Sequence, residues 1–283
     1  MLTDYDVIGP IHIADPVNRS HPLHRGRVAW WMTLPGLDGG NTIHDLAGRS
    51  HILLTSSWSG RAWANIPRPG GFGCCDLGSY NGVLALVPGN MPGPTVVGPP
   101  ISLLAWVRPT ALGAYRWAIE ENSAHGGVGM GGAAGSPLAY WWEGSSDEYN
   151  FNSGLLLTVN EWALIAVVIT PTDATVYRVN ATGLSSAVNT KTHSSHTTGG
   201  WAFACNPSST SQYWTGQLDD ISVYNRALSA AEIRQYYDLS RTGYPGMLNR
   251  WGQRTAASAA AAVVAGGLSG GLSIGAGRMV IGI

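Results

Sequence analysis

The sequence predicts an all-β fold of antiparallel sheets, closed as a sandwich or a barrel. Glycine (38 residues), proline (16) and tryptophan (12) are abundant in the 283-residue chain, a mixture typical of many short strands joined by turns. Short apolar segments recur between turn signals, and no helix-spaced segment interrupts them, which favours antiparallel pairing. Charged residues make up 12% of the chain, about half the roughly 25% usual in globular domains. We therefore expect neighbouring subunits to cover much of the surface.

The expected strands follow one another along the chain, separated by turn signals such as PTALGA, NSAHGG and TPTDAT. They are residues 26–34, 52–55, 82–87, 101–107, 116–120, 137–142, 154–159, 163–170, 174–179, 201–204 and 213–224. Residues 1–24, which precede them, predict an extended arm. Asp4 and Asp6 stand where a signal peptide carries positive charge, and Pro10 and Pro16 break any apolar region, so we expect no signal peptide.

A short helix is expected directly after the last strand, in the stretch GQLDDISVYNRALSAAEIRQYYDL. Ser229 and Glu232 have the spacing of a capping box, in which each side chain satisfies a free backbone N–H at the start of a helix. Leu228 and Ile233 stand at the positions of a hydrophobic staple. The sequence therefore predicts a helix over residues 229–239 that closes a domain spanning residues 25–254.

Residues 255–283 form a third region, a tail built almost wholly from alanine, glycine, serine and small aliphatic residues. Residues 255–277 carry no charge and could span a bilayer by length, but their many glycines weaken a helix. We favour a tail that becomes ordered against neighbouring subunits over a membrane span. Its last six residues, RMVIGI, are apolar and β-branched enough to add as a strand to a neighbour's sheet edge.

The stretch GQLDDISVYNRALSAAEI resembles the closing signature of the laminin-G-like (LamG, concanavalin A-like) jelly-roll domains. Three further stretches resemble the family in the same order: GRVAWWMTLPGLDGGNTIHDLAGRSHILLTSSW, CCDLGSYNGVLAL and ISLLAWVRP. The resemblance covers residues 25–239 and implies a jelly-roll β-sandwich with a short helix across its edge. The flanks NRSHPLHRGRVAWW and SRTGYPGMLNRWGQR resemble LamG-type proteins encoded beside capsid genes in bacteriophages. That second resemblance implies a virion protein assembled in the host cytoplasm.

Catalytic carboxylates come into question because glucanases share this architecture. A retaining glycosidase needs two carboxyl groups about 5–5.5 Å apart, which in a sheet means alternate positions on one strand. The Glu-x-Asp-x-x-Glu strand motif of those glucanases is absent, and the adjacent Glu120 and Glu121 should point to opposite faces. The remaining candidates lie in the loop WWEGSSDEYN, where we expect a solvated surface: Glu143, Asp147 and Glu148. We expect no enzymatic activity.

Calcium is the one cofactor that the sequence suggests. Asp45 and either Asp219 or Asp220, expected on opposite faces of their strand, could offer oxygens together with the carbonyls of residues 39–41. We favour the alternative in which Asp219 or Asp220 hydrogen-bonds loop N–H groups and holds the Asp45 loop. His193 and His196 form an exposed pair in a loop without a third metal ligand.

Loop and strand aromatics offer a ligand site. Trp141 and Trp142 are adjacent, so one of them should face outward. With Trp117, Tyr140 and Tyr149 they predict a platform for sugar rings. The alternative, which we favour, is that these rings fill the core or a subunit interface.

The sequence thus predicts a non-catalytic structural or decoration protein of a phage virion. Its partners would be itself or other capsid proteins, with glycans as additional ligands. The net charge of −1 offers no field for nucleic acid. The alternatives are a free-standing carbohydrate-binding module and, less favoured, a glucanase.

Overall fold

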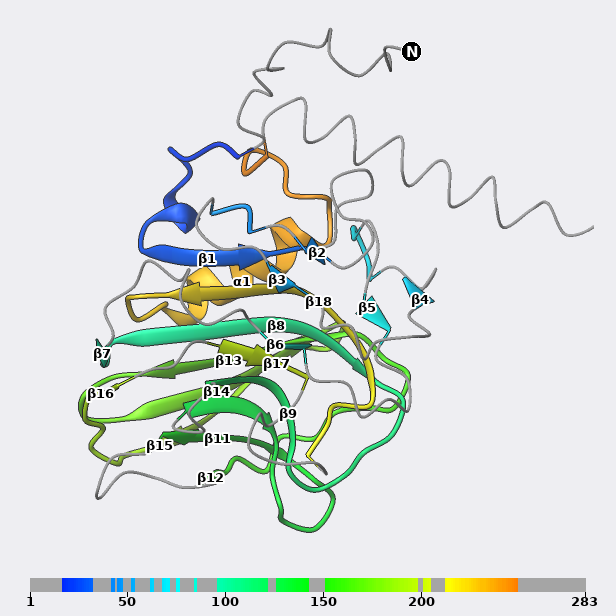
Figure 1. The fold of residues 1–283 in the computed structure, drawn as a ribbon, viewed down its shortest axis with the longest axis vertical. Helices are drawn as coiled ribbons and strands as arrows, with labels where there is room; N and C mark the ends of the chain where they lie inside the picture. The colour runs from blue at the N-terminus through cyan, green and yellow to red at the C-terminus, as the bar shows by residue number, and fades with distance from the viewer. Residues whose placement is uncertain are drawn as a thin grey trace, which may run out of the picture.

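The computed structural model describes residues 17–32, 42–43, 45–47, 52–53, 62–63, 68–71, 75–76, 84–85, 96–121, 126–142, 151–197, 201–204 and 212–248. Two antiparallel sheets lie face to face, and one helix covers the outer face of the larger sheet (Figure 1). The predicted all-β sandwich is confirmed.

The larger sheet has the strand order β15-β14-β13-β8-β18-β5-β4, and β1 also pairs with β18. Its long central strands contribute residues to both apolar cores of the domain. The bounds are β1 Arg27–Trp31, β4 Ala62–Trp63, β5 Cys75–Asp76, β8 Ile101–Pro109, β13 Ala163–Ile169, β14 Ala174–Asn180, β15 Gly183–Asn189 and β18 Gly216–Tyr224.

The smaller sheet has the order β12-β11-β10-β9-β17-β6. Its strands are β6 Leu84–Ala85, β9 Arg116–Glu121, β10 Gly126–Met130, β11 Leu138–Trp142, β12 Phe151–Asn152 and β17 Trp201–Phe203. Two short pairs complete the described strands: β2 Thr42–Ile43 with β3 Ile52–Leu53, and β7 Val96–Val97 with β16 His196–Thr197.

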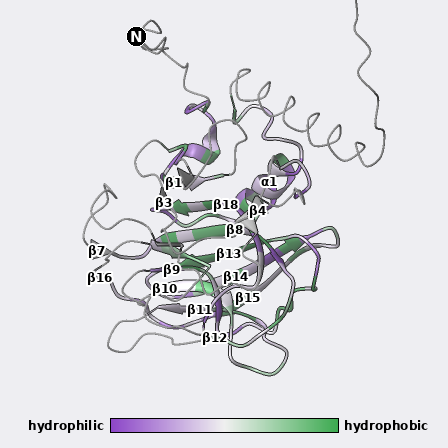
Figure 2. Cartoon of the chain, turned by 45° about the vertical axis from the view of Figure 1, so that its right-hand side comes forward, coloured by the Kyte–Doolittle hydropathy of each residue, from purple (hydrophilic) through white to green (hydrophobic). Residues whose placement is uncertain are grey.

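Two apolar cores lie on the two faces of the larger sheet. Between the sheets, Leu103 and Val167 pack with Phe203 and Trp142. On the outer face, the side chains of the larger sheet pack under the helix α1 (Ala230–Ser240) and the segments that flank the domain. Figure 2 shows hydrophobic residues concentrated along the central strands β8 and β13, which is expected of strands that face a core on both sides.

The junction between β18 and α1 confirms the predicted cap. Glu232 N donates to Ser229 Oγ over 3.2 Å, and Ser229 N donates to Glu232 Oε2 over 2.9 Å. Leu228 and Ile233 are both buried against the second core, as a staple requires. Local sequence therefore specifies the turn from strand to helix.

One predicted strand is wrong, and several strands of the structure were not predicted. Residues 154–159 form no strand, because this segment carries the chain from β12 in one sheet to β13 in the other. The two longest of the unpredicted strands are β10, whose first glycines were interpreted as a turn, and β15, whose glycine and polar residues lack an apolar strand pattern. In β10, a Cβ on Gly127 or Gly129 would lie 2.5 or 2.3 Å from a carbonyl oxygen of β9, so glycine permits the close approach of these strands.

The predicted N-terminal arm is wrong for residues 17–24. Val17 forms a bridge with Leu248, Asn18 N donates to the carbonyl of Met247 over 2.9 Å, and Leu23 is buried in the second core. Residues 1–16 and the predicted tail, residues 255–283, lie outside the described residues. No helix among the residues described above is long and apolar enough to cross a membrane.

Candidate functional site

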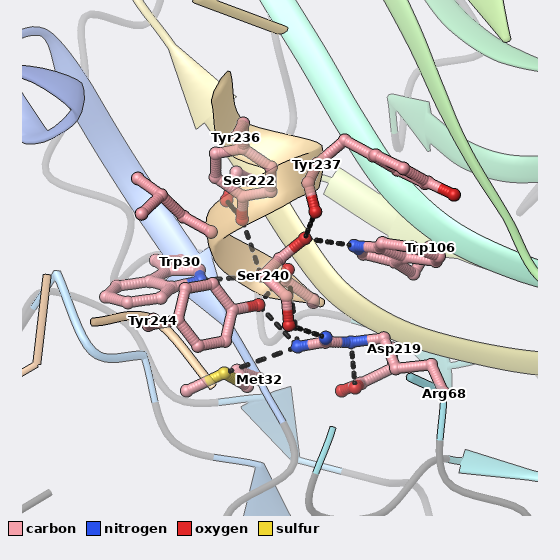
Figure 3. Close-up of polar contacts among 12 residues, drawn as sticks. Trp30, Met32, Arg68, Trp106, Asp219, Ser222, Tyr236, Tyr237, Ser240 and Tyr244 are labelled. Carbon is pink, nitrogen blue, oxygen red and sulfur yellow. Dashed lines mark hydrogen bonds and ion pairs between the residues drawn. The ribbon is translucent and has the colours of Figure 1, made fainter. Parts of the chain in front are cut away.

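Asp219 and Asp220, candidate metal ligands from the sequence, both contact Arg68 beneath the helix (Figure 3). Asp219 lies opposite Trp106, on the helix side of the sheet, so strict alternation would aim Asp220 into the other core. The expectation of opposite faces is wrong, because the register shifts after Asp219 and Asp220 takes a φ of 54°. Such a bulge redirects a side chain. Arg68 Nε lies 2.7 Å from Asp219 Oδ2, and Arg68 Nη2 lies 3.5 Å from Asp220 Oδ2.

Further donors satisfy the remaining oxygens of Asp220. Its Oδ1 accepts from Trp30 Nε1 over 2.7 Å and from the Tyr236 hydroxyl over 2.6 Å, and its Oδ2 accepts from the Tyr244 hydroxyl. Arg68 also donates to the carbonyl of Ser240 over 2.7 Å, at the end of α1. We call Trp30, Arg68, Asp219, Asp220, Tyr236, Ser240 and Tyr244 the helix-side network; it ties β1, β18 and α1 to the chain after the helix.

Burial and neighbouring charges shift the pKa values of Arg68 and Tyr236 in the helix-side network. Burial alone would lower the pKa of Arg68, but Tyr244 and the two carboxylates outweigh that effect and raise the pKa. Burial and the charge of Asp220 raise the pKa of Tyr236 well above its ordinary value, so this phenol stays a neutral donor. The network therefore acts as a structural ion pair with its hydrogen bonds made.

Calcium does not fit these residues. Asp45 Oδ1 accepts from the backbone N–H groups of Trp30 and Ala47, each over 2.8 Å, so Asp45 itself holds its loop, a role that the sequence predicted for Asp219 or Asp220. Calcium takes six to eight oxygen ligands, whereas a guanidinium occupies the space between Asp219 and Asp220. No group of three or more His, Cys, Asp or Glu that could hold a metal occurs among the described residues. Residues 39–41 lie outside them.

The predicted aromatic platform is buried where the structure describes it. Trp141 and Trp142 of β11 do point to opposite faces, but they are 1% and 0% exposed, so the expectation of one solvent-facing ring is wrong. Trp141 packs edge-on against Trp117 of β9, with ring centroids 4.1 Å apart, and Trp117 is also fully buried. Tyr140 and Trp142 lie in the core between the sheets. Tyr149 lies outside the described residues.

His193 is likewise buried rather than exposed as expected. Its Nδ1 lies 3.1 Å from the carbonyl of Thr170, which can only accept, so Nδ1 carries the hydrogen. Its Nε2 then accepts from the Tyr140 hydroxyl over 2.9 Å. Nothing is described of the His196 side chain. His193 thus connects the Tyr140 hydroxyl of β11 to the carbonyl of Thr170, the residue that follows β13.

Glu120 is a buried carboxyl group whose character the sequence did not predict. Cross-strand pairing places it in a row on the outer face of the smaller sheet with Trp141, Gly127 and Ala202. Its side chain is fully buried, and neither carboxyl oxygen has a hydrogen-bond partner among the described residues. Burial, with a smaller contribution from Glu121, raises the pKa of Glu120 to about 9. The group is therefore a neutral carboxylic acid at pH 7.

The described strands of the smaller sheet place no pair of carboxyl groups on its outer face. Glu120 and Glu121 are the carboxyl-bearing residues of its described strands, and Glu121 points to the other face, in a cross-strand pair with Trp201. Two carboxyl groups on one face are what a glycosidase needs. A single neutral carboxyl can donate and accept hydrogen bonds, as a hydroxyl-bearing ligand requires. The loop candidates Glu143, Asp147 and Glu148 lie outside the described residues.

Comparison with known proteins places this fold in a family. A family model described as concanavalin A-like lectin/glucanases superfamily matches residues 80–234, more than half of the chain. None of the curated protein sequences matches.

Similar solved structures are β-sandwich domains at low identity. Domain 4 of AbnA, a GH43 extracellular arabinanase from Geobacillus stearothermophilus, in complex with arabinotriose, is 15% identical at a TM-score of 0.45, covering 73% of this chain and 85% of that one. A Trypanosoma rangeli sialidase is 12% identical at 0.52, covering 75% and 33%. The binding domain of Paraclostridial Mosquitocidal Protein 1 is 15% identical at 0.52, covering 75% and 52%. This chain thus spans about a third of the sialidase, and these likenesses show the fold alone.

Proposed function

The chain belongs to the concanavalin A-like lectin/glucanases superfamily, and from this premise we propose that it is a non-catalytic structural protein. It acts by associating with other protein chains, as a decoration or assembly component of a phage virion. One observation carries the non-catalytic part: the described strands of the smaller sheet place Glu120 and Glu121 on opposite faces. A double displacement at a sugar carbon needs both groups on one side.

The flanks of the domain support the assembly part. Val17 and Leu248 form a bridge, and Asn18 Nδ2 donates to the carbonyl of Gly246 over 2.7 Å. The chain therefore enters and leaves the domain at adjacent points (Figure 1). A partner bound at that place would meet both flanks, which are the segments that resemble phage proteins. The 12% charged content supports a surface covered by partners.

Light scattering coupled to size-exclusion chromatography tests the association of the purified full chain. We expect a mass above that of the 29.8 kDa monomer, rising with concentration. A monomer at every concentration, alone and with the candidate capsid proteins, would contradict the assembly role.

A second assay tests the non-catalytic part. We expect no reducing sugar from β-glucans, galactans or arabinans after prolonged incubation. Turnover that disappears in Glu120→Gln would show that this carboxyl is catalytic and would overturn the proposal.

A carbohydrate-binding module is the second candidate function. The observation that favours it is Glu120, a buried neutral carboxyl without a described partner, beside the rings of Trp141 and Trp117. Such a group is expected to find a partner in a native structure, and a sugar hydroxyl would supply one only after the side chains that bury Glu120 move aside. A glycan array tests this candidate: binding that Glu120→Gln weakens and the exposed Glu161→Gln leaves unchanged would support it.

A further inference from the structure

The two ends of the larger sheet differ in how they are built. One end is β4, a two-residue strand, and the smaller sheet likewise begins and ends with two-residue strands, β12 and β6. The other end of the larger sheet is β15, seven residues long. No described residue pairs with its outer edge. Among the described residues its outer row of backbone N–H and C=O groups stays unpaired, and such a row can pair with another strand.

β15 lacks the features that usually protect an edge strand. Its sequence, GLSSAVN, has neither a charged residue nor a proline. Its register with β14 runs without a bulge from Gly183 to Asn189. Edge strands that must stay unpaired usually carry lysine, proline or a bulge, or are short. The structure thus offers a long, regular and uncharged edge.

One face of β15 is incompletely covered. Leu184, Ser186 and Val188 lie opposite Val179, Tyr177 and Thr175 of β14, on the helix side of the sheet. Leu184 packs partly buried against the second core, whereas Val188 is 57% exposed. A strand added at this edge would extend the second core and cover the side chain of Val188.

We propose that the outer edge of β15 accepts residues 278–283 of a second copy of this chain as an added strand. This proposal rests on the association proposed above. The segment has the sequence RMVIGI and carries no charged side chain after Arg278. Its six residues are close in length to the seven-residue strand β15. In a strand, Met279, Ile281 and Ile283 share one face, which would continue the apolar helix side.

The length of the chain after the domain permits this exchange. Residues 249–277 separate the segment from Leu248, and they are rich in glycine, alanine and serine. A chain of 29 residues can span at most about 100 Å when fully extended, which is enough to reach a neighbouring copy. Figure 1 shows β15 at the edge of the larger sheet away from β1, near which the chain leaves the domain. A strand donated by a neighbour would therefore join two copies without changing the fold of either domain.

A complementation experiment tests the donor and acceptor roles separately. The acceptor variant carries Ser186→Lys and Val188→Lys, both exposed positions, and the donor variant lacks residues 278–283. We expect each variant alone to self-associate at least tenfold more weakly than the full chain. Mixed in equal amounts, they should form a one-to-one complex, because each supplies what the other lacks. Leu112→Lys with Val159→Lys, exposed apolar residues outside β15, is the matched control and should associate normally.

The outcomes separate this proposal from the proposed function. If the full chain associates and the acceptor variant does so equally well, the β15 proposal is wrong while the association stands. If the donor variant associates normally, or if the mixture stays monomeric, pairing between two β15 strands or another contact replaces the proposal. A full chain that is monomeric in every test contradicts both, including the case in which residues 278–283 cover their own β15.

Discussion

Asp220 and Glu120 are both fully buried carboxyl groups, but their surroundings are opposite. Asp220 lies beneath the helix beside Arg68, and its oxygens accept from one indole and two phenols. Glu120 lies on the outer face of the smaller sheet, beside Gly127 and Trp141, and the described residues offer it no donor. Burial alone therefore does not determine the role of an acidic residue.

The two sites differ in whether the described residues give the buried carboxyl group a counter-charge and hydrogen bonds. A buried charge is costly unless a counter-charge and hydrogen bonds replace water. The helix-side network supplies both, so its charges hold elements together. The described residues around Glu120 supply neither, and the group keeps its proton, with a pKa of about 9. The first site is a structural ion pair, and the second is a buried neutral carboxyl group without a hydrogen-bond partner among the described residues.

The largest effect is expected from Arg68→Met. This change leaves Asp219 and Asp220 buried without their counter-charge, and breaking a buried pair costs about 3–5 kcal/mol of unfolding free energy. Urea unfolding measures it. The triple variant Arg68→Met, Asp219→Asn, Asp220→Asn removes the charges together and should recover part of the loss. The exposed pair Arg234–Asp238 is the control, and Arg234→Met should leave the unfolding curve unchanged. Equal effects from the two arginines would mean that the buried network contributes nothing special.

Glu120→Gln should have an intermediate effect, with the opposite sign. The folded-state pKa of about 9 lies above the unfolded value of about 4.5, so folding retains a proton that the unfolded chain releases. The stability that this proton contributes is complete below pH 4.5 and is lost as the pH rises toward 9. The variant has no such dependence, and at pH 8 it should be more stable than the parent by at least about 1 kcal/mol.

Thermal melts at pH 4, 6 and 8 measure this effect. The parent and Glu120→Gln should converge at pH 4 and separate at pH 8, while the exposed Glu161→Gln should follow the parent throughout. Parallel curves for parent and Glu120→Gln would show that this carboxyl is charged in the folded protein, with a partner that compensates it.

The smallest effect is expected at the helix cap. Ser229→Ala removes the acceptor for Glu232 N and should lower the unfolding free energy by about 1 kcal/mol. Ser229→Asp keeps an acceptor at the same position and should restore most of it. Coincident melting curves for parent and Ser229→Ala would show that the capping box does not stabilise the folded protein.

Regular local patterns allowed much of the fold to be predicted. β8, β9, β11, β13 and β14 lie within two residues of their predicted bounds, because apolar β-branched runs between turn signals have few alternatives. The strand β10 was missed because a glycine's local preference is for turns, and its role here is to let β9 approach. The buried position of His193 and of both tryptophans in β11 depends on contacts between distant segments.

By itself, the sequence determined the all-β class, the antiparallel pairing and the capped helix after β18, because each follows from the spacing of neighbouring residues. Tertiary structure alone decided the roles of the acidic residues. Alternation along β18 predicts opposite faces for Asp219 and Asp220, but the bulge and the positive φ bring both to Arg68, 151 residues away from Asp219. Glu120 is just as visible in the sequence, but whether its carboxyl group is protonated depends on burial and on the side chains that surround it. A carboxyl group's charge is set by its distance to donors and to water, and only the folded chain fixes those distances.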